Sequence, residues 1–296
     1  MSLPLHAETS ERIWYYTFRG ICTLIFLFLI VPILIIIPLS FNAQPYFTFT
    51  PEMLSFDPAG YSTRWYDDFF SSATWQAAVR NSLIIAVFST IISTFLGTLA
   101  ALGLSRPDFP YKTAVMGILI SPMVVPLIIS AAGMFFFYSD FLWLGQMTDG
   151  AFKISLSNTH LGVILAHAAL ATPFVVITVT ATLVGFDHSL TRAAASLGAS
   201  PTRTFFKITV PLITPGVISG ALFAFITSFD EVVVVLFVGS VKQRTIPWAM
   251  FSGIREEISP TILAVATILI TFSVILLFTL EVLRRRNERL RGLSPE

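Results

Sequence analysis

Two adjacent carboxylates, Asp230 and Glu231, stand inside a long apolar segment of this sequence. A charged side chain at the centre of a membrane-spanning helix costs about 2.5–3.5 kcal/mol, so such residues are usually functional. Neighbouring positions on a helix point about 100° apart, and the two carboxylates are not expected to face one cavity. We predict that one of them, Asp230 before Glu231, holds or steers a cationic solute or forms a gate. The alternative is a polar contact between helices that involves no solute.

A histidine, His167, lies in the middle of another apolar segment, near Thr172 and Pro173. We place it with the two carboxylates in the predicted substrate path or gate, although polar packing against a neighbouring helix is the more common role. His160 lies two turns earlier, but no third ligand accompanies the pair, so we expect no metal site.

Two kinds of chemistry are missing from the sequence. It has no G-x-x-x-x-G-K-[ST] phosphate-binding loop, and it has no recognisable pairing of a nucleophile with a base. We therefore expect no nucleotide, no cofactor and no enzymatic activity.

The composition indicates an integral membrane protein. The 296 residues are 55% hydrophobic and 12% charged, with a mean hydropathy of +0.80, whereas soluble domains carry about 25% charged residues. The net charge of +1 predicts no nucleic-acid partner. The single cysteine, Cys22, excludes a disulfide within the chain.

Six apolar segments are long enough to cross about 30 Å of hydrocarbon, which takes about 20 helical residues. The first is too long for the apolar core of a cleaved signal peptide. The third contains Ser121, Pro122 and Pro126, which predict a kink or a break. We divide the chain into an N-terminal tail (1–17), one membrane domain (18–284) and a basic tail (285–296). The predicted spans are about 18–40, 80–104, 113–138, 160–185, 210–237 and 260–283.

The distribution of lysine and arginine predicts that both termini are cytoplasmic, because cytoplasmic segments carry the excess of these residues. Twelve of the 18 then lie inside: Arg12, Arg19, Arg106, Lys112, Arg192, Arg203, Lys207, Arg284, Arg285, Arg286, Arg289 and Arg291. The aromatic stretch 41–79, with Trp65 and Trp75, and the later Trp143 and Trp248 then lie outside. Such residues either rest on lipid headgroups, which we favour, or contact an external partner.

The cytoplasmic loop 188–211 has the signals of two short helices. Ser189 can cap a first helix over 190–197, and Gly198 permits the left-handed conformation that ends a helix. Ser200-Pro201 then begins a second helix. The small side chains of the first helix allow another backbone to come close, so the loop is either a docking knob or an ordinary amphipathic connector.

This loop resembles the EAA signature of permease subunits of ABC importers, E-A-A-x-x-L-G-A followed by I-x-L-P. Arg192 stands where that family usually has Glu, and Val210 where it has Leu. The matching residues are Ala193, Ala194, Leu197, Gly198, Ala199, Ile208 and Pro211. The segments Ser228–Val234 and Ser252–Pro260, which includes Arg255, Glu256 and Glu257, are similar to the spermidine/putrescine-type permeases.

The resemblance implies an all-α membrane protein of six transmembrane helices, with the type I ABC importer permease (MetI-like) fold and cytoplasmic coupling helices. The matching loop residues, with Arg192, would then contact two ATP-binding subunits, which hydrolyse ATP in place of this chain. Further implied partners are a second permease subunit, identical or not, an extracytoplasmic solute-binding protein and the lipid bilayer. The expected location is the bacterial inner membrane, and the expected solute is polyamine-like or opine-like. The alternative is a secondary transporter driven by an ion gradient, with Asp230 or Glu231 as its ion site.

Overall fold

The computed structural model describes residues 8–106, 108–139, 156–187, 189–256 and 259–290. Within these ranges the chain is nearly all helical, and one isolated bridge between Asn42 and Tyr61 is the only β-type pairing. The predicted all-α class is therefore confirmed. The chain divides into two compact units, Ala73–Ser252 and Met1–Ser72 with Gly253–Glu296, where we predicted one membrane domain over 18–284.

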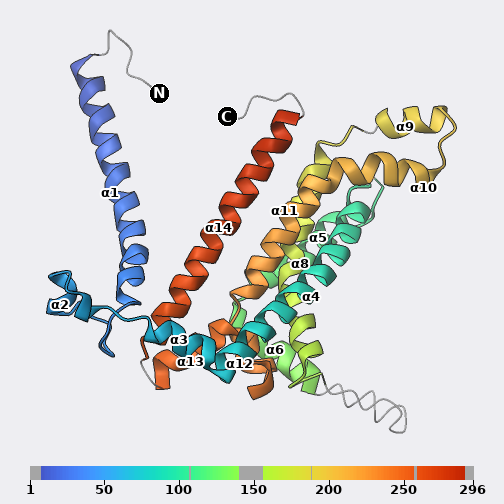
Figure 1. Ribbon diagram of the computed structural model, residues 1–296. Helices are drawn as coiled ribbons and strands as arrows, with labels where there is room; N and C mark the ends of the chain where they lie inside the picture. The colour runs from blue at the N-terminus through green and yellow to red at the C-terminus, as the bar shows by residue number, and fades with distance from the viewer. Residues whose placement is uncertain (1–7, 107, 140–155, 188, 257–258, 291–296) are drawn as a thin grey trace, which may run out of the picture. The chain divides into compact units, whose positions relative to one another are not determined.

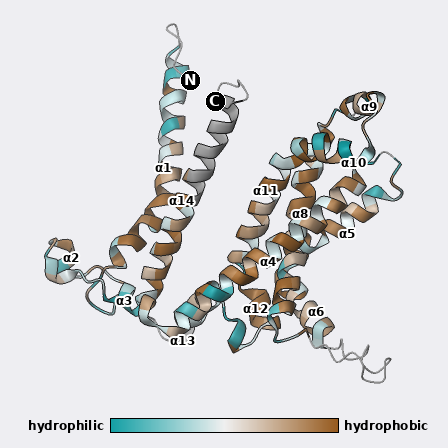
Figure 2. Ribbon diagram, turned by 45° about the vertical axis from the view of Figure 1, so that its right-hand side comes forward, coloured by the Kyte–Doolittle hydropathy of each residue, from teal (hydrophilic) through white to brown (hydrophobic). Residues whose placement is uncertain are grey.

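The larger unit is built around α8 (His160–Val184). Two long helices, α4 (Ala73–Leu104) and α11 (Val210–Phe229), pack along it (Figure 1). In the most apolar window of α8, 67% of the residues are buried, against 28% in α4 and 22% in the helix that contains α11. Apolar residues run along all three helices in Figure 2. We infer that α8 is the core and that α4 and α11 also present apolar faces outward.

Glycines allow α4 and α11 to approach α8 closely. A Cβ atom on Gly97 would lie 2.7 Å from the Val175 Cβ, and one on Gly220 would lie 3.0 Å from the Val175 Cα. On Gly216, one turn before Gly220, a Cβ would meet the side chain of Thr182. Small residues at such contacts are typical of helix packing in membranes, where backbones meet at short range.

The third predicted span is broken, as its prolines indicated. α5 (Lys112–Val124) and α6 (Leu127–Ser139) together are long and apolar enough to cross a membrane, but they are bent by 104°. The break lies at Val125 and Pro126, and Val125 has the extended conformation that a following proline favours. Pro122 stays inside α5.

The helix expected over 210–237 has different bounds. It begins earlier, because α10 (Pro201–Thr204) and a π-helical turn, η2 (Phe205–Thr209), run directly into α11 to make one helix over Pro201–Phe229. It also ends earlier, at Phe229, and a short helix α12 (Val233–Val238) follows. α9 (Ser189–Ser196) lies beside α10, at the opposite end of the unit from α12 (Figure 1). A 3-10 turn, η3 (Val241–Gln243), and α13 (Ile246–Glu256) come next.

The smaller unit contains α1 (Thr9–Leu39), α2 (Pro51–Leu54), η1 (Pro58–Gly60), α3 (Arg64–Ser71) and α14 (Thr261–Leu290). The aromatic loop after α1 has its own hydrogen bonds. The Ser40 hydroxyl lies 2.6 Å from the Tyr66 hydroxyl, and Trp65 Nε1 donates to the Asn42 carbonyl oxygen at 2.8 Å. Trp65, one of the predicted interfacial aromatics, is thus half-buried at the start of α3, where it is hydrogen-bonded to the loop after α1.

By length and hydropathy, four helices can cross a membrane, and the bent pair would be a fifth span. The apolar part of α14 among the described residues, Thr261–Ile275, is shorter than the length this test requires, so the sixth span stays a prediction. Several predicted features lie outside the described residues: residues 1–7, Trp143, Glu257–Ile258 and residues 291–296.

Replacing Gly220 by alanine tests the close contact between α11 and α8. The new Cβ would lie 3.0 Å from a backbone atom of α8, and we expect overpacking to destabilise the protein by about 1–3 kcal/mol. The thermal unfolding midpoint in lipid nanodiscs measures this. Gly103→Ala on α4 is the control, because its Cβ would meet nothing within 4 Å. Equal midpoints for the two variants would contradict the packing described.

Candidate functional site

The loop between α8 and α11 folds as predicted into helix, turn and helix. The first helix, α9, begins differently from expectation: Ser189 is its first residue and does not cap it. The Asp187 carboxylate accepts hydrogen bonds from the Ser189 N–H at 2.8 Å and from the Ser189 hydroxyl at 2.7 Å. A carboxylate before a helix suits the unpaired amides and the partial positive charge there.

The turn after α9 is closed by Gly198, whose φ is +80°. Gly198 N–H donates to the Ala195 carbonyl and Ala199 N–H donates to the Ala194 carbonyl, both at 3.0 Å. This pair of bonds is the usual end of a helix whose next residue is left-handed, a conformation that glycine adopts without strain. Ser200 then caps α10 by accepting a bond from the Arg203 N–H at 3.3 Å.

One side of α9 is buried, and the side chains on its other sides are exposed or half-buried. Ala194 is the buried residue of α9, and α9 contacts α10 and η2. Leu197, in contrast, is 88% exposed, which is unusual for a leucine that packs within its own chain. The other predicted contact residues are exposed (Arg192, Ala193, Gly198 and Pro211) or half-buried (Ala199 and Ile208).

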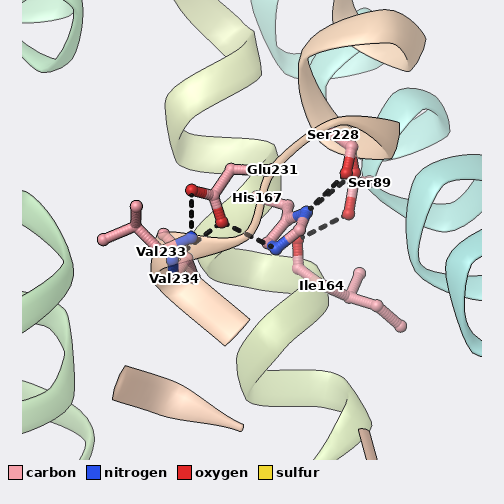
Figure 3. Close-up of polar contacts among 7 residues, drawn as sticks. All are labelled: Ser89, Ile164, His167, Ser228, Glu231, Val233 and Val234. Atoms are coloured by element: carbon pink, nitrogen blue, oxygen red, sulfur yellow. Dashed lines mark hydrogen bonds and ion pairs between the residues drawn. The ribbon is translucent and has the colours of Figure 1, made fainter. Parts of the chain in front are cut away.

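The two adjacent carboxylates have different environments. α11 ends at Phe229, and Asp230, the residue after it, is exposed. Glu231 is 7% exposed, and its two oxygens accept hydrogen bonds from the N–H groups of Val233 at 2.8 Å and Val234 at 2.7 Å (Figure 3). The helix restarts at α12 because the Glu231 side chain replaces the missing carbonyl acceptors, which is why the predicted span to 237 is interrupted.

His167 lies in the middle of α8, fully buried, and faces this break (Figure 3). Its Nδ1 is 2.9 Å from the Ser228 hydroxyl and 3.1 Å from the Ser228 carbonyl oxygen. Its Nε2 is 3.6 Å from the Glu231 Oε2 and has no hydrogen-bond partner. The structure thus brings together His167 and Glu231 of the predicted site, and it leaves Asp230 outside their contacts.

The order hydroxyl, imidazole, carboxylate in Ser228, His167 and Glu231 is also that of a hydrolase triad. Ser228 is only 4% exposed, on the last turn of a helix. A substrate carbonyl cannot reach its hydroxyl there. The arrangement therefore supports polar packing between α8 and α11.

Two further polar contacts tie α4 to its neighbours in the same unit. The Ser89 hydroxyl donates to the Ile164 carbonyl oxygen at 3.0 Å, one turn before His167 (Figure 3). Asn81 Nδ2 donates to the carbonyl oxygens of Lys242 and Arg244 at 2.8 and 2.9 Å. The loop between α12 and α13 is thereby fixed to α4.

His160 belongs to this second network and does not approach His167's contacts. Its Nε2 is 3.1 Å from Asn81 Oδ1, and its Nδ1 is 3.3 Å from Gln243 Nε2. Among the described residues, no three His, Cys, Asp and Glu side chains are grouped so that they could hold a metal ion.

The sequence reasoning missed Ser228, Ser89, Asn81 and Gln243 as members of these networks. The sequence could have pointed to Ser228, because it precedes Glu231 by three residues, which is about one turn of a helix. Asn81 and Gln243 are far apart in sequence, and nothing near either residue identifies its partner.

Residues 93–289 match the family described as binding-protein-dependent transport system inner membrane component. The spermidine/putrescine transport system permease protein PotC of Haemophilus influenzae is 32% identical over 263 residues, covering 89% of this chain and 94% of that protein. PotC of Escherichia coli is 32% identical and covers 90% and 93%. The putrescine transport system permease protein PotI of Escherichia coli is 32% identical and covers 83% and 82%.

Solved structures share the fold. A bacterial ABC transporter involved in the import of the acidic polysaccharide alginate aligns with a TM-score of 0.66 at 16% identity, over 94% of this chain and 98% of that one. The alginate transporter in complex with its oligosaccharide-bound periplasmic protein aligns with the same TM-score at 17% identity, over 93% and 96%. These similarities agree with the predicted fold.

The turn after α9 can be tested through Gly198. A valine there must adopt a left-handed backbone, which costs about 1–2 kcal/mol, and we expect the end of α9 to fray. Hydrogen exchange of the Ala199 amide should become faster in the valine variant. Gly198→Asn is the control, since asparagine tolerates this conformation. Equal protection of the Ala199 amide in the two variants would contradict the account.

Proposed function

This chain belongs to the family of inner membrane components of binding-protein-dependent transport systems, and we propose that it works as the permease subunit of an ABC importer for a polyamine-like cation. The importer class follows from the family. The solute class is our proposal and rests on the permeases named for spermidine and putrescine at 32% identity over most of the chain. Family membership favours ATP-driven import over the ion-gradient alternative.

We propose that two ATP-binding subunits dock on α9 of this chain and of a second permease subunit. The observation that carries this is the exposed surface of α9 and the turn after it, which presents small side chains together with Leu190 and, in the turn, Leu197, which is 88% exposed. Such a surface lets a partner backbone approach and fill the space around Leu197. Arg192, on α9, is exposed and supplies a positive charge where the family usually has an acidic residue.

Movement of α9 would be transmitted along a continuous helix. α9 contacts α10 and η2, and α10, η2 and α11 then continue as one helix to Phe229. A push on α9 by the closing ATP-binding subunits would therefore reach the break that precedes α12. ATP binding biases the membrane unit toward one of two states, and hydrolysis resets it.

The proposed orientation has α9 and both termini in the cytoplasm, as the lysine and arginine bias predicts. The loop between α12 and α13 lies at the other end of its unit from α9 and would face outward (Figure 1). An extracytoplasmic solute-binding protein would deliver the cation on that side. Asp230, at the same end of α11 and exposed, is then our proposed carboxylate on the solute path.

The docking proposal predicts a loss of ATP-binding subunits when Leu197 becomes polar. A leucine buried at an interface contributes about 1.5–3 kcal/mol, so Leu197→Ser should weaken the association at least about tenfold in co-purification from membranes. Leu54→Ser is the matched control, because Leu54 is 69% exposed in the other unit, in a segment predicted to lie outside. Retention of the subunits by the Leu197 variant would overturn the docking proposal.

The solute-path proposal predicts a defect in Asp230→Asn. A hydrogen bond to a charged group contributes about 1.5–3 kcal/mol, so the concentration of spermidine or putrescine for half-maximal uptake should rise about tenfold or more in proteoliposomes. Co-purified ATP-binding subunits must be retained. Asp67→Asn, an exposed carboxylate on α3, controls for a general loss of charge. Unchanged uptake and affinity would contradict the role of Asp230.

A further inference from the structure

A single buried ring contacts both sides of the break between α11 and α12. On one side, His167 Nδ1 lies 2.9 Å from the Ser228 hydroxyl, in the last turn of α11. On the other side, Nε2 lies 3.6 Å from the Glu231 carboxylate, which holds the first amides of α12. Figure 3 shows the ring between Ser228 and Glu231.

Nδ1 faces both the hydroxyl and the carbonyl oxygen of Ser228, and the tautomer of the ring decides which of them it pairs with. If the Ser228 hydroxyl donates to Nδ1, the proton of a neutral imidazole must be on Nε2. That proton then faces the Glu231 Oε2, whose own Val234 contact is 2.7 Å. Nε2 is buried and makes no hydrogen bond among the described residues, so its contact with the Glu231 carboxylate at 3.6 Å is electrostatic, and a move of Glu231 toward water would remove that contact.

The ring itself is held in place from the opposite side. His167 belongs to α8, the most buried of the long helices. Ser89 of α4 donates to the Ile164 carbonyl, one turn away. The α8 backbone beside His167 is therefore held by a contact that does not involve α12.

We infer that His167 is a positioning residue, which keeps the Glu231 carboxylate at the start of α12 and so leaves Asp230 as the acidic residue presented to the solute. Glu231 then stabilises the backbone break and does not bind the solute itself. The inference rests on the proposed function in one respect only, namely that Asp230 meets the solute. The contacts of His167 with Ser228 and Glu231 stand without it.

The test measures how open the start of α12 is. In the assembled transporter in lipid nanodiscs, with Cys22→Ser as background, Val234→Cys is labelled with a water-soluble thiol reagent. Val234 is fully buried, so labelling should be slow. In His167→Leu we expect labelling to be several-fold faster, because leucine removes the imidazole that lies 3.6 Å from Glu231 Oε2. Val179→Cys, fully buried on α8, is the control and should stay slow.

Two conservative variants separate positioning from general packing. His167→Gln places a side-chain amide near the position of Nε2. It should restore slow labelling of Val234→Cys and uptake of spermidine. His167→Asn places its amide near the position of Nδ1, so it keeps the contact with Ser228 but not the contact with Glu231. It should restore neither slow labelling nor uptake. This comparison also decides the matter if His167→Leu fails to assemble.

Three results would overturn the inference: unchanged labelling in His167→Leu, asparagine rescuing as well as glutamine, or faster labelling of Val179→Cys together with Val234→Cys. Because thiol labelling needs no solute, these outcomes are distinct from a failure of the proposed function. That failure would appear as spermidine uptake by the parent transporter that follows an ion gradient without ATP.

Discussion

The helix α11 stops inside an apolar part of the chain, and the backbone amides after the stop need acceptors. Lipid provides none, and non-helical backbone at membrane depth is tolerated only where protein or a water-filled cavity satisfies it. Glu231 supplies both acceptors from one side chain, to Val233 and Val234. The bounds of α11 and α12, the burial of Glu231 and the exposure of Asp230 all depend on this one contact.

The break that Glu231 stabilises lies at one end of a long helix in the larger unit. α8 is packed between α4 and α11 through glycines that let the helices meet at backbone distance. One end of the α10–α11 helix carries α9, whose surface is exposed, and the other end carries the break. In the proposed function, this continuous helix would connect the surface where the ATP-binding subunits dock with the break at the other end.

Local signals predicted much of this structure. Hydropathy and length predicted the long helices, Pro126 predicted the bend between α5 and α6, and Gly198 predicted the turn after α9. The break at Asp230 was not predicted, because the two carboxylates were read as side chains within one helix, whereas Glu231 accepts hydrogen bonds from the amides of Val233 and Val234 in place of helix carbonyls. The contact of Asn81 with the loop at Lys242 joins distant residues, and a single sequence carries no record of that proximity.

The central claim is that ATP binding on the α9 side changes the environment of the break at the other end of α11. The most direct measurement is the thiol reactivity of Asp230→Cys in a Cys22→Ser background, in the assembled transporter with its binding protein, with and without a non-hydrolysable ATP analogue. The account predicts that the analogue changes the labelling rate several-fold, and that Leu197→Ser abolishes the change. Equal rates with and without the analogue, in a transporter shown to bind it, would contradict the account.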